Sequence, residues 1–489
     1  MDGKIIRDPV HGYISVEKRI CERFIDTKIF QRLRFIEQTS MRWLFPGGRH
    51  DRFVHSLGVY HLAVQVFEAL TRNSSSPRVK EYLKSKGIRE TFVLAALMHD
   101  CGHAPFSHTT EFLYNKFYTG EYHGRAYALL HDAVGHEHKA DFEIRQIGDK
   151  PADHEAMSAL IVLRCFSDVM RNDEFKADPD LAARMITGIL FSEPDTVEKK
   201  IANILIGLIN GKAIDVDKLD YIMRDTWASG IENTSVDIGR LLGAATITDD
   251  GGGTPVLSFN STAISVIQTV IDARNHLYEW VYGHHTPLYY AELQRRLCVD
   301  LAKKLSSESD PDGREALASM FSVDALTDER GISVSGEVVV GMNDSDLASA
   351  FKRHCLQTTS YDSYFGHSPA HVPLWKSEAE YRIRIAKRRQ YAMDKNVCAR
   401  KIREKFGFSD SECFAIDGMS AKVYDIEESA VNVSMNDGKI HPFTDLVNPI
   451  RHVMADGSMK HPFFYLFIPR DRTNQRDEVV ETINSSYWT

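Results

Sequence analysis

The sequence predicts a mainly α-helical protein with small β-hairpin elements and a mixed α/β region towards the C-terminus. Apolar residues recur at helical spacing through most of the first 305 residues. Short β-branched or aromatic runs, one of them bounded by glycine on both sides, appear chiefly in the last third of the chain. A serine- and aspartate-rich stretch at 306–313 is the best linker candidate. We therefore expect a helical core over 1–305 and a C-terminal α/β region over 314–489.

The individual elements follow from local patterns. A short strand and turn are expected at 4–17, where proline and glycine provide the turn. Helical spacing predicts helices over 20–70 (broken at 45–48), 92–98, 108–117, 155–166, 180–190, 197–227, 262–282 and 287–305. Strands are expected as a hairpin at 246–257, around a glycine-rich turn, and at 337–340, 411–416 and 463–468.

Length and composition are those of a globular protein. The chain has 489 residues, of which 43% are hydrophobic and 26% charged, and both fractions are ordinary for a soluble domain. It contains neither an apolar stretch long enough for a membrane span nor a signal-peptide pattern, so we expect no membrane partner and a cytoplasmic location. Seven cysteines without a C-x-x-C pair fit a reducing compartment. The net charge of −9 argues against a general nucleic-acid-coating role.

The strongest functional signal follows the apolar run at 92–98. His99 and Asp100 come directly after it, and the helix then breaks, so His103 and His108 should lie on a turn over the same point. Imidazole and carboxylate together suit Fe, Mn, Zn, Co or Ni. Taken alone, this cluster leaves two interpretations open, a metal site and a hydrogen-bonded polar turn.

Two further segments favour the metal site. His55 lies near the start of an expected helix, and Asp217 interrupts an otherwise apolar helical pattern. With His99 and Asp100 they form the order His, His-Asp, Asp on separate helices, which is the HD-domain signature. From residue 8 to about 300 the sequence resembles the HD-domain deoxynucleoside triphosphate triphosphohydrolases related to the sterile-alpha-motif and HD-domain protein, without the sterile-alpha-motif domain.

The resemblance implies an HD-type helical core that hydrolyses deoxynucleoside triphosphates to deoxynucleoside and triphosphate. One divalent ion (Fe, Mn, Zn, Co or Ni) would be held by His55, His99, Asp100 and Asp217, with Mg²⁺ as a further ion on the phosphates. An open coordination position would accept water or phosphate. The implied catalytic residues are His103, His108, His154 and Glu155, with Glu155 orienting His154. Which histidine is the general acid stays open, and a role for His103 in orienting a metal ligand is an equal alternative.

Substrate contacts are implied position by position. They are Gln38, Thr39, Arg52, Lys218, Tyr221, Asp225, Arg274 and Tyr282. Arg52 and Lys218 also have a physical case, because an anionic substrate requires nearby cations. Thr39 replaces an apolar residue of the family, which leaves the sugar preference open.

Regulation by a nucleotide activator is also implied. The residues matching the family's activator sites are Lys4, Asp26, Gln31, Arg34, Phe45, Asp237 and Arg240. Because those sites lie between subunits in the family, a homo-oligomer, dimer or tetramer, is expected, with 314–489 serving regulation or oligomerisation. The alternative is structural: Asp26 caps a helix and Arg34 pairs with it.

Two segments fall outside the family pattern. A histidine-rich insertion at about 119–152 is expected to be a solvated surface segment, with a lid or a second metal site at His136 and His138 as alternatives. The basic run 382–389 is expected to be a solvated face, with nucleotide or single-stranded nucleic-acid contact as the alternative.

Two other functional interpretations stay open. One is an HD-type nucleotide phosphatase or phosphodiesterase, and the other is a catalytically inactive nucleotide or nucleic-acid sensor. Arg52, Lys218 and Arg274 favour a triphosphate, since several cations suit a longer phosphate chain. The complete ligand set, together with His108 and His154, counts against a sensor.

Overall fold

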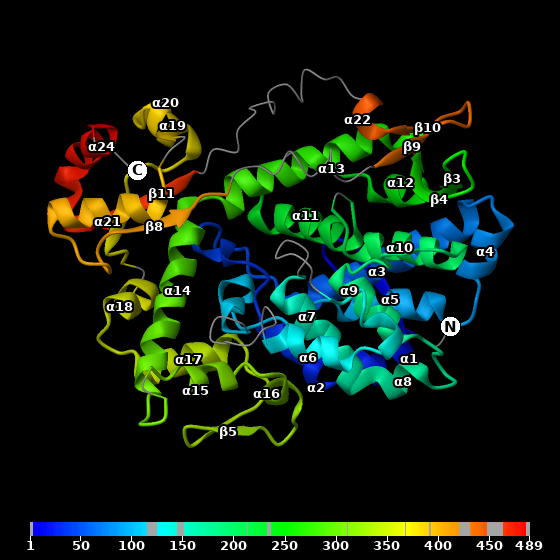
Figure 1. Cartoon of the computed structure of the whole chain (residues 1–489), viewed down its shortest axis with the longest axis horizontal. Coiled ribbons are helices and arrows are strands. Elements are labelled where there is room, and N and C mark those ends of the chain that lie inside the picture. The colour runs from blue at the N-terminus through cyan, green and yellow to red at the C-terminus, as the bar shows by residue number, and fades with distance from the viewer. Residues whose placement is uncertain are drawn as a thin grey trace.

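The computed structural model is mainly helical, with small sheets of two to four strands (Figure 1), which confirms the predicted fold class. It describes residues 3–114, 125–143, 151–212, 214–231, 236–310, 312–366, 368–390, 393–419, 431–446 and 463–485. No described helix has both the length and the hydrophobicity needed to cross a membrane.

The elements of the first half are β1 (Gly3–Asp8), β2 (Gly12–Glu17), α1 (Lys18–Ile20), α2 (Lys28–Gln31), α3 (Arg52–Asn73), α4 (Pro77–Leu83), α5 (Ile88–Met98), α6 (Arg125–Ala133), α7 (Asp153–Ile161), α8 (Ser167–Arg171), α9 (Pro179–Thr187), α10 (Val197–Ile209), α11 (Val216–Ser229) and α12 (Ile238–Gly243). Those of the second half are β3 (Ala245–Asp249), β4 (Pro255–Asn260), α13 (Ile264–Leu277), α14 (His285–Lys304), α15 (Arg314–Ser319), α16 (Val323–Thr327), β5 (Ile332–Val334), β6 (Glu337–Val339), α17 (Asp344–His354), α18 (Thr359–Phe365), β7 (His371–Pro373), α19 (Glu378–Arg384), α20 (Lys387–Gln390), α21 (Lys395–Phe406), β8 (Phe414–Asp417), β9 (Asn432–Ser434), β10 (Ile440–Pro442), α22 (Phe443–Leu446), β11 (Phe464–Pro469) and α24 (Arg476–Ser485).

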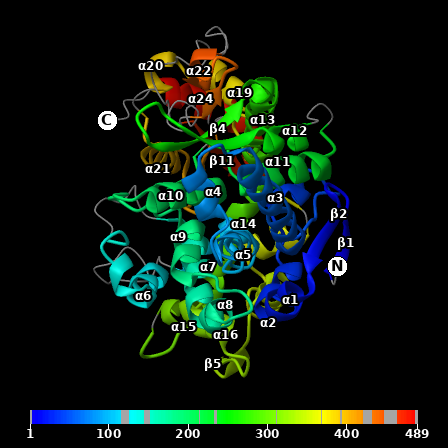
Figure 2. The same ribbon diagram turned by 90° about the vertical axis from the view of Figure 1, so that its right-hand side faces the viewer.

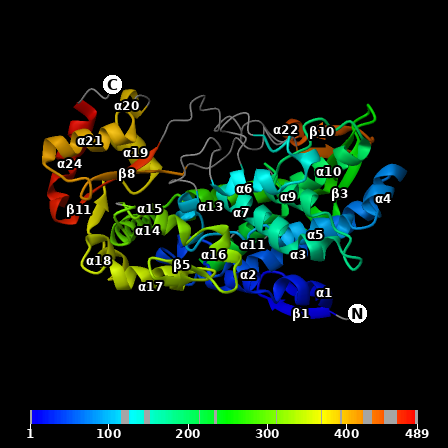
Figure 3. The same ribbon diagram turned by 60° about the horizontal axis from the view of Figure 1, so that its bottom comes forward.

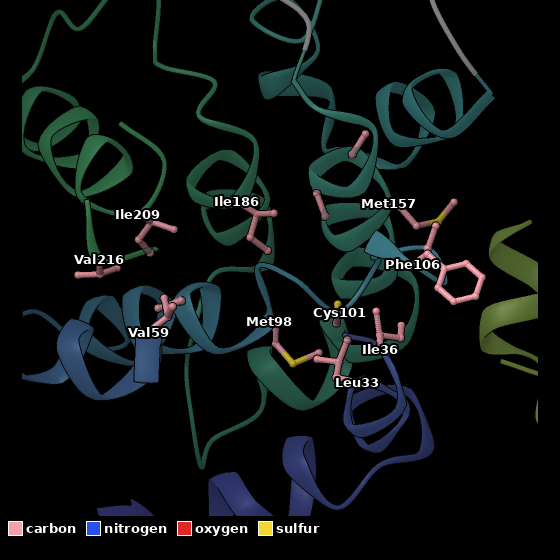
Figure 4. Close-up of a cluster of buried hydrophobic side chains, with 14 of the residues drawn as sticks. Leu33, Ile36, Val59, Met98, Cys101, Phe106, Met157, Ile186, Ile209 and Val216 are labelled. Carbon is pink, nitrogen blue, oxygen red and sulfur yellow. The ribbon is translucent and has the colours of Figure 1, made fainter. Parts of the chain in front are cut away.

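Helix α5 is the centre of the core. Every residue from Thr91 to Met98 is buried, as expected for a helix that is apolar all round. It packs against α3 and α9, and α3 in turn packs against α11 (Figure 2). Figure 4 shows the buried side chains of Leu33, Met98 and Cys101 lying close together at the end of α5. The end of α5 is therefore held in place by packing on several sides.

Two predicted helices are divided in the structure. The helix expected over 197–227 is α10 and α11, because Asp215 begins a new helix by accepting a hydrogen bond from the Lys218 backbone N–H (2.7 Å). The segment expected over 20–70 forms short turns before α3, which begins where Asp51 accepts from the Val54 N–H (3.0 Å). The helix expected at 108–117 is a pair of short 3₁₀ turns as far as residue 114, and 115–117 lie outside the described residues.

The C-terminal region returns to the core. Strand β9 pairs in parallel with β4 and so extends the β3–β4 hairpin, while β11 forms a separate sheet with β7 and β8. Figure 3 shows β10 and α22 at the β3 end of the molecule, with α21 and α24 at the opposite end. The division at 306–313 stays a prediction, and the regions on either side of it share a sheet.

Part of the histidine-rich insertion is packed, which corrects the expectation of a solvated segment. Helix α6 packs against α7, and Tyr127 and Phe142 are buried, with the Tyr127 hydroxyl donating to the Phe142 carbonyl (2.5 Å). His138 Nδ1 accepts a hydrogen bond from Arg184 (3.0 Å). Within the described part of the chain His136 and His138 belong to no metal-binding group. Residues 119–124 and 144–150 of the insertion lie outside the described residues.

Candidate metal centre and active site

Three helices bring the four predicted metal ligands together. His55 lies on α3, His99 and Asp100 follow α5, and Asp217 lies in the first turn of α11. The distance from His55 Nε2 is 3.5 Å to Asp100 Oδ2 and 3.0 Å to Asp217 Oδ1. The distance from His99 Nε2 is 3.4 Å to Asp100 Oδ1 and 3.8 Å to Asp217 Oδ1. His55, His99 and Asp100 lie close enough together to hold one divalent ion, and Asp217 Oδ1 lies beside the two histidines.

The hydrogen bonding of the two histidines also fits a metal ion. His55 Nδ1 bonds to Asp220 Oδ2 (2.7 Å), and His99 Nδ1 bonds to the Ala96 carbonyl (2.8 Å). Their Nε2 atoms are buried and have no hydrogen-bond partner among the described residues. Metal-binding histidines are typically held in this way by the nitrogen that faces away from the ion.

Both ligand carboxylates are held ionised. Burial alone would raise the pKa of Asp100 and Asp217. For Asp100 the charge of Arg52, whose Nη1 lies 2.7 Å from Oδ2, and the nearby histidines hold the pKa well below its ordinary value. For Asp217 the neighbouring His55 and His99 lower the pKa in the same direction. The site therefore places two anionic carboxylates beside the two imidazole rings.

Asp220 is a functional candidate that the sequence interpretation missed. It is fully buried and bonds to His55, to His11 Nε2 (2.5 Å) and to Arg224 through both oxygens (2.8 and 3.0 Å). Arg224 also donates to Asp8 (2.9 Å). The sequence pattern that could have identified Asp220 is its position three residues after Asp217, which places both carboxylates on neighbouring parts of one helix face.

The approach of α11 to α3 depends on Gly58, and its replacement by alanine is expected to destabilise the fold by about 1–3 kcal/mol. A Cβ at Gly58 would lie 1.8 Å from Asp220 Oδ1 and 2.6 Å from Arg224 Nη2. Urea unfolding measures the loss. The matched control is Gly207→Ala in α10, where a Cβ meets nothing within 4 Å. Alanine there should increase the free energy of unfolding by at most about 1 kcal/mol. Equal effects of the two substitutions would contradict the close approach.

A second cluster lies beside the metal ligands. Glu111 Oε1 is 2.7 Å from His103 Nδ1 and 3.1 Å from His108 Nδ1, and its Oε2 is 3.1 Å from His154 Nδ1. His103 Nε2 in turn lies 3.1 Å from Asp100 Oδ1, which joins the two clusters. The four residues are spaced closely enough to hold a metal ion themselves.

The cluster gives its histidines different protonation states. Burial would lower the pKa of His154, but the charge and hydrogen bond of Glu111 raise it to about 9. Burial and the positive charge of Arg52 lower the pKa of His103 to about 3. At neutral pH His154 therefore carries a proton that it can donate, whereas His103 is neutral.

The partner that orients His154 differs from the prediction. Glu111, which was not among the predicted residues, bonds to His154 Nδ1. Glu155 instead accepts a hydrogen bond from the Ala152 backbone N–H (2.7 Å) at the start of α7. Glu155 does not face His154, because the side chains of neighbouring residues in a helix point in different directions. The i, i+3 spacing of His108 and Glu111 is the sequence pattern that could have identified Glu111.

A cavity of about 270 Å³ adjoins the second cluster. It brings together seven of the predicted residues: Gln38, Thr39, Arg52, His108, Tyr221, Asp225 and Tyr282. Asp225 accepts a hydrogen bond from the Tyr282 hydroxyl and lies 2.7 Å from His50 Nε2. The wall thus presents a fixed carboxylate and three tyrosine rings to a ligand.

Lys218 and Arg274 are not among the residues that line this cavity. Lys218 Nζ donates to Asp215 Oδ2 (2.6 Å) and to the Gly211 carbonyl (2.8 Å). Arg274 lies over the Tyr278 ring, 5.4 Å from its centroid, and is close enough to Lys218 to influence its pKa. These two cations lie on the Asp217 side of the site.

The residues predicted for activator binding form separate groups. Lys4 and Asp26 are 4.0 Å apart, and Arg34 donates to Gln31 (2.7 Å) while its guanidinium stacks 3.5 Å from the Phe53 ring centroid. The alternative interpretation, in which Asp26 caps a helix and pairs with Arg34, was wrong. Thr27 caps α2 instead, and Arg34 bonds to Gln31.

Of the remaining activator residues, Phe45 packs against the hydrophobic core from the turn before α3. Asp237 caps α12 through the backbone N–H of Arg240 (3.0 Å). In the basic run 382–389, Arg382 and Arg384 pair with glutamates four residues earlier on α19, as on a solvated helix face.

Comparison with known proteins identifies an HD domain in this chain. The HD domain model matches residues 52–205. The deoxynucleoside triphosphate triphosphohydrolase SAMHD1 homolog of Dictyostelium discoideum is 29% identical over 283 residues, which are 58% of this chain and 46% of the relative. SAMHD1 of Gallus gallus is 29% identical over 296 residues (58% and 42%), and the uncharacterized protein YwfO of Bacillus subtilis is 26% identical over 284 residues (58% and 52%). The chain spans about half the length of these relatives.

Two solved structures share the fold. A hypothetical protein from Aquifex aeolicus and a phosphohydrolase from Bacteroides thetaiotaomicron each align with a TM-score of 0.61 at 19% identity. The alignments cover 98% and 96% of this chain and 100% of each structure. With its converging His, His-Asp and Asp side chains, the chain contains an HD domain and is similar to deoxynucleoside triphosphate triphosphohydrolases that carry one.

Proposed function

We propose that this protein is a metal-dependent hydrolase that cleaves deoxynucleoside triphosphates to deoxynucleoside and triphosphate. The observation that carries the proposal is the junction of the two clusters, where Asp100 contacts both a metal-ligand histidine and His103. The cavity beside this junction offers Asp225 and Tyr282 for a sugar and Arg52 for a phosphate. Relatives that carry the name of this activity support the substrate class.

The chemistry divides between the ion and the side chains. A divalent ion held by His55, His99, Asp100 and Asp217 would activate water and polarise a phosphoryl oxygen. The leaving oxygen of the deoxynucleoside needs a proton, and His154 holds one because of Glu111. His103 is neutral and lies between Asp100 and Glu111, so it suits orientation of those carboxylates. We therefore assign the general acid to His154.

The negative charge of the phosphate chain needs cations close to the metal. Lys218 remains charged, because Asp215 offsets the effect of burial and raises its pKa. Arg274 lies over Tyr278, which lines the cavity, and is close enough to Lys218 to influence its pKa. Two cations in this region suit a substrate that carries several phosphates.

Product analysis tests the proposal. Purified protein is incubated with Mn²⁺ or Mg²⁺ and each deoxynucleoside triphosphate, alone and in pairs, and the products are separated by ion-exchange chromatography. Triphosphate with deoxynucleoside is the expected pair. Orthophosphate or monophosphate products would instead identify a phosphatase or phosphodiesterase, and absence of product with every pair would contradict the hydrolase assignment.

We also propose that a nucleotide activates a homo-oligomer through Lys4, Asp26, Gln31 and Arg34 and through Phe45, Asp237 and Arg240. The family resemblance supports this, and the exposed side chains of Lys4 and Asp26 leave them accessible. Mass photometry with and without the second nucleotide of an active pair measures the change in assembly. If the mass does not change and a single nucleotide supplied alone is hydrolysed, the activator is removed from the proposal.

The pH dependence of turnover should reflect His154. Because its pKa is raised to about 9, the acid form is present below that pH, and kcat should fall as pH rises through about 9. Glu111→Gln removes the charge that raises the pKa, so the alkaline limb should move to lower pH. Initial rates between pH 6 and 10 check this shift, and Glu155→Gln is the control that should move the limb less. A profile that Glu111→Gln leaves in place would contradict the assignment.

A further inference from the structure

A segment of the C-terminal region contacts the turn that carries the catalytic histidines. Asp344, the first residue of α17, accepts two backbone hydrogen bonds from distant parts of the core. Its Oδ1 accepts from the Phe106 N–H (2.6 Å) and its Oδ2 from the Glu37 N–H (3.0 Å). Both bonds span more than 230 residues of chain, so they form only when the C-terminal region is in place.

The turn that Asp344 holds has an unusual backbone. Phe106 and Ser107 have φ angles of 59° and 53°, and both are non-glycine residues in the left-handed region. Two such residues in succession are costly and persist only where surrounding contacts hold them. The Ser107 hydroxyl donates to the Glu37 carbonyl (2.5 Å). Asp344 thus holds one end of a closed set of bonds around this turn.

The same set of bonds reaches the metal ligands. Ser107 Oγ accepts from Arg52 Nε (3.0 Å), and Arg52 Nη1 donates to Asp100 Oδ2 (2.7 Å). His108 is the next residue along the turn, so its placement follows that of Ser107. A displacement at Phe106 would therefore move both a cluster histidine and the arginine that holds a metal ligand.

A second contact joins the same two regions. Arg32 is buried, and its guanidinium donates to the carbonyls of Met342 (2.8 Å), Cys101 (3.0 Å) and His103 (2.7 Å). Arg32 thereby joins the segment that leads into α17 to the Cys101–His103 segment that follows Asp100.

We propose that Asp344 is a positioning residue for the HD centre, through which the C-terminal region holds the Phe106–Ser107 turn in its catalytic geometry. This inference deepens the proposed function and rests on it for its kinetic readout. Asp344 touches neither the metal ligands nor the cavity lined by the predicted substrate residues. Its effect passes through the backbone of the turn.

Asp344→Asn tests the proposal with little change in size. The amide nitrogen cannot accept a backbone N–H, so one of the two bonds is lost. We expect kcat to fall by about 10- to 100-fold, as for small misplacements of reacting groups, with a smaller change in KM and unchanged metal content. The matched control is Asp346→Asn, because this exposed carboxylate on the same helical turn bonds to Asn343 within its own capping box.

Hydrogen exchange followed by mass spectrometry gives a readout that does not depend on activity. Peptides containing Phe106 and Glu37 should exchange faster in Asp344→Asn than in the natural protein. In Asp346→Asn the same peptides should exchange at the rate of the natural protein. If Asp344→Asn does not fold, Ser107→Ala removes the hydrogen bond from the Ser107 hydroxyl to the Glu37 carbonyl. This variant should show the same faster exchange and lower kcat.

The possible failures are distinguishable. A natural protein without activity on any nucleotide would overturn the proposed function, while the exchange comparison would still test the positioning role. Unchanged exchange, or a kcat within about twofold of the natural protein's, would overturn the positioning role.

Discussion

Replacing His99 with alanine is expected to remove the bound metal ion and to lower kcat by about 10³-fold or more. His99 supplies one of two imidazole ligands, and its Nε2 has no other partner among the described residues. An ion that has lost this ligand binds weakly and no longer activates water at the junction of the two clusters. Metal content per chain, measured by mass spectrometry, and product formation in the same preparation check the expectation.

The fold should survive this substitution. His99 follows α5 and contributes one local hydrogen bond, to the Ala96 carbonyl, so its loss leaves the packing of α5 against α3 and α9 in place. Far-ultraviolet circular dichroism should be unchanged. His354→Ala on α17, which removes a histidine near Glu337 and far from the ligands in sequence, should keep both metal and activity. Full turnover by a metal-free His99→Ala protein would refute the metal-dependent mechanism.

Replacing Asp220 with asparagine is expected to have the largest effect on stability, about 3–5 kcal/mol. The carboxylate is buried among His11, His55 and Arg224. Without it the Arg224 guanidinium retains only Asp8 as a buried counter-charge among the described residues. Metal affinity should fall by about 10- to 100-fold, because His55 loses the partner that orients its ring. Urea unfolding and metal titration measure the two effects.

The effect of Asp220 should also depend on pH. Burial would raise its pKa, but Arg224 and the two histidines hold it well below the ordinary value. A carboxylate with a lowered pKa stabilises the fold above its unfolded pKa of about 4 and loses that contribution as pH falls through the folded pKa. The Asp220→Asn protein should therefore lose less stability between pH 5 and 3 than the natural protein. Asp132→Asn, an exposed change on α6, should leave the pH profile as it is.

The helical class and a His/Asp cluster that could hold a metal ion could be predicted because both are encoded locally. Apolar spacing identified α5, α13 and α14, and the β3–β4 hairpin followed from its glycine-rich turn. The His-Asp pair directly after a buried helix, with one further ligand on each of two other helices, could be recognised by residue type and order. The boundary between α10 and α11 was missed, because the capping role of Asp215 competes with an apolar pattern that continues through it.

The sequence by itself determined which residue types are available for a metal centre and on which helices they lie. The tertiary structure alone decided their partners: Asp220 for His55, Glu111 for His154, and Asp344 for the Phe106 turn. The physical reason is that helical periodicity depends on neighbours within a few residues. Hydrogen-bond partners instead depend on which helix faces meet, and the hydrogen bonds described above join residues up to 310 positions apart.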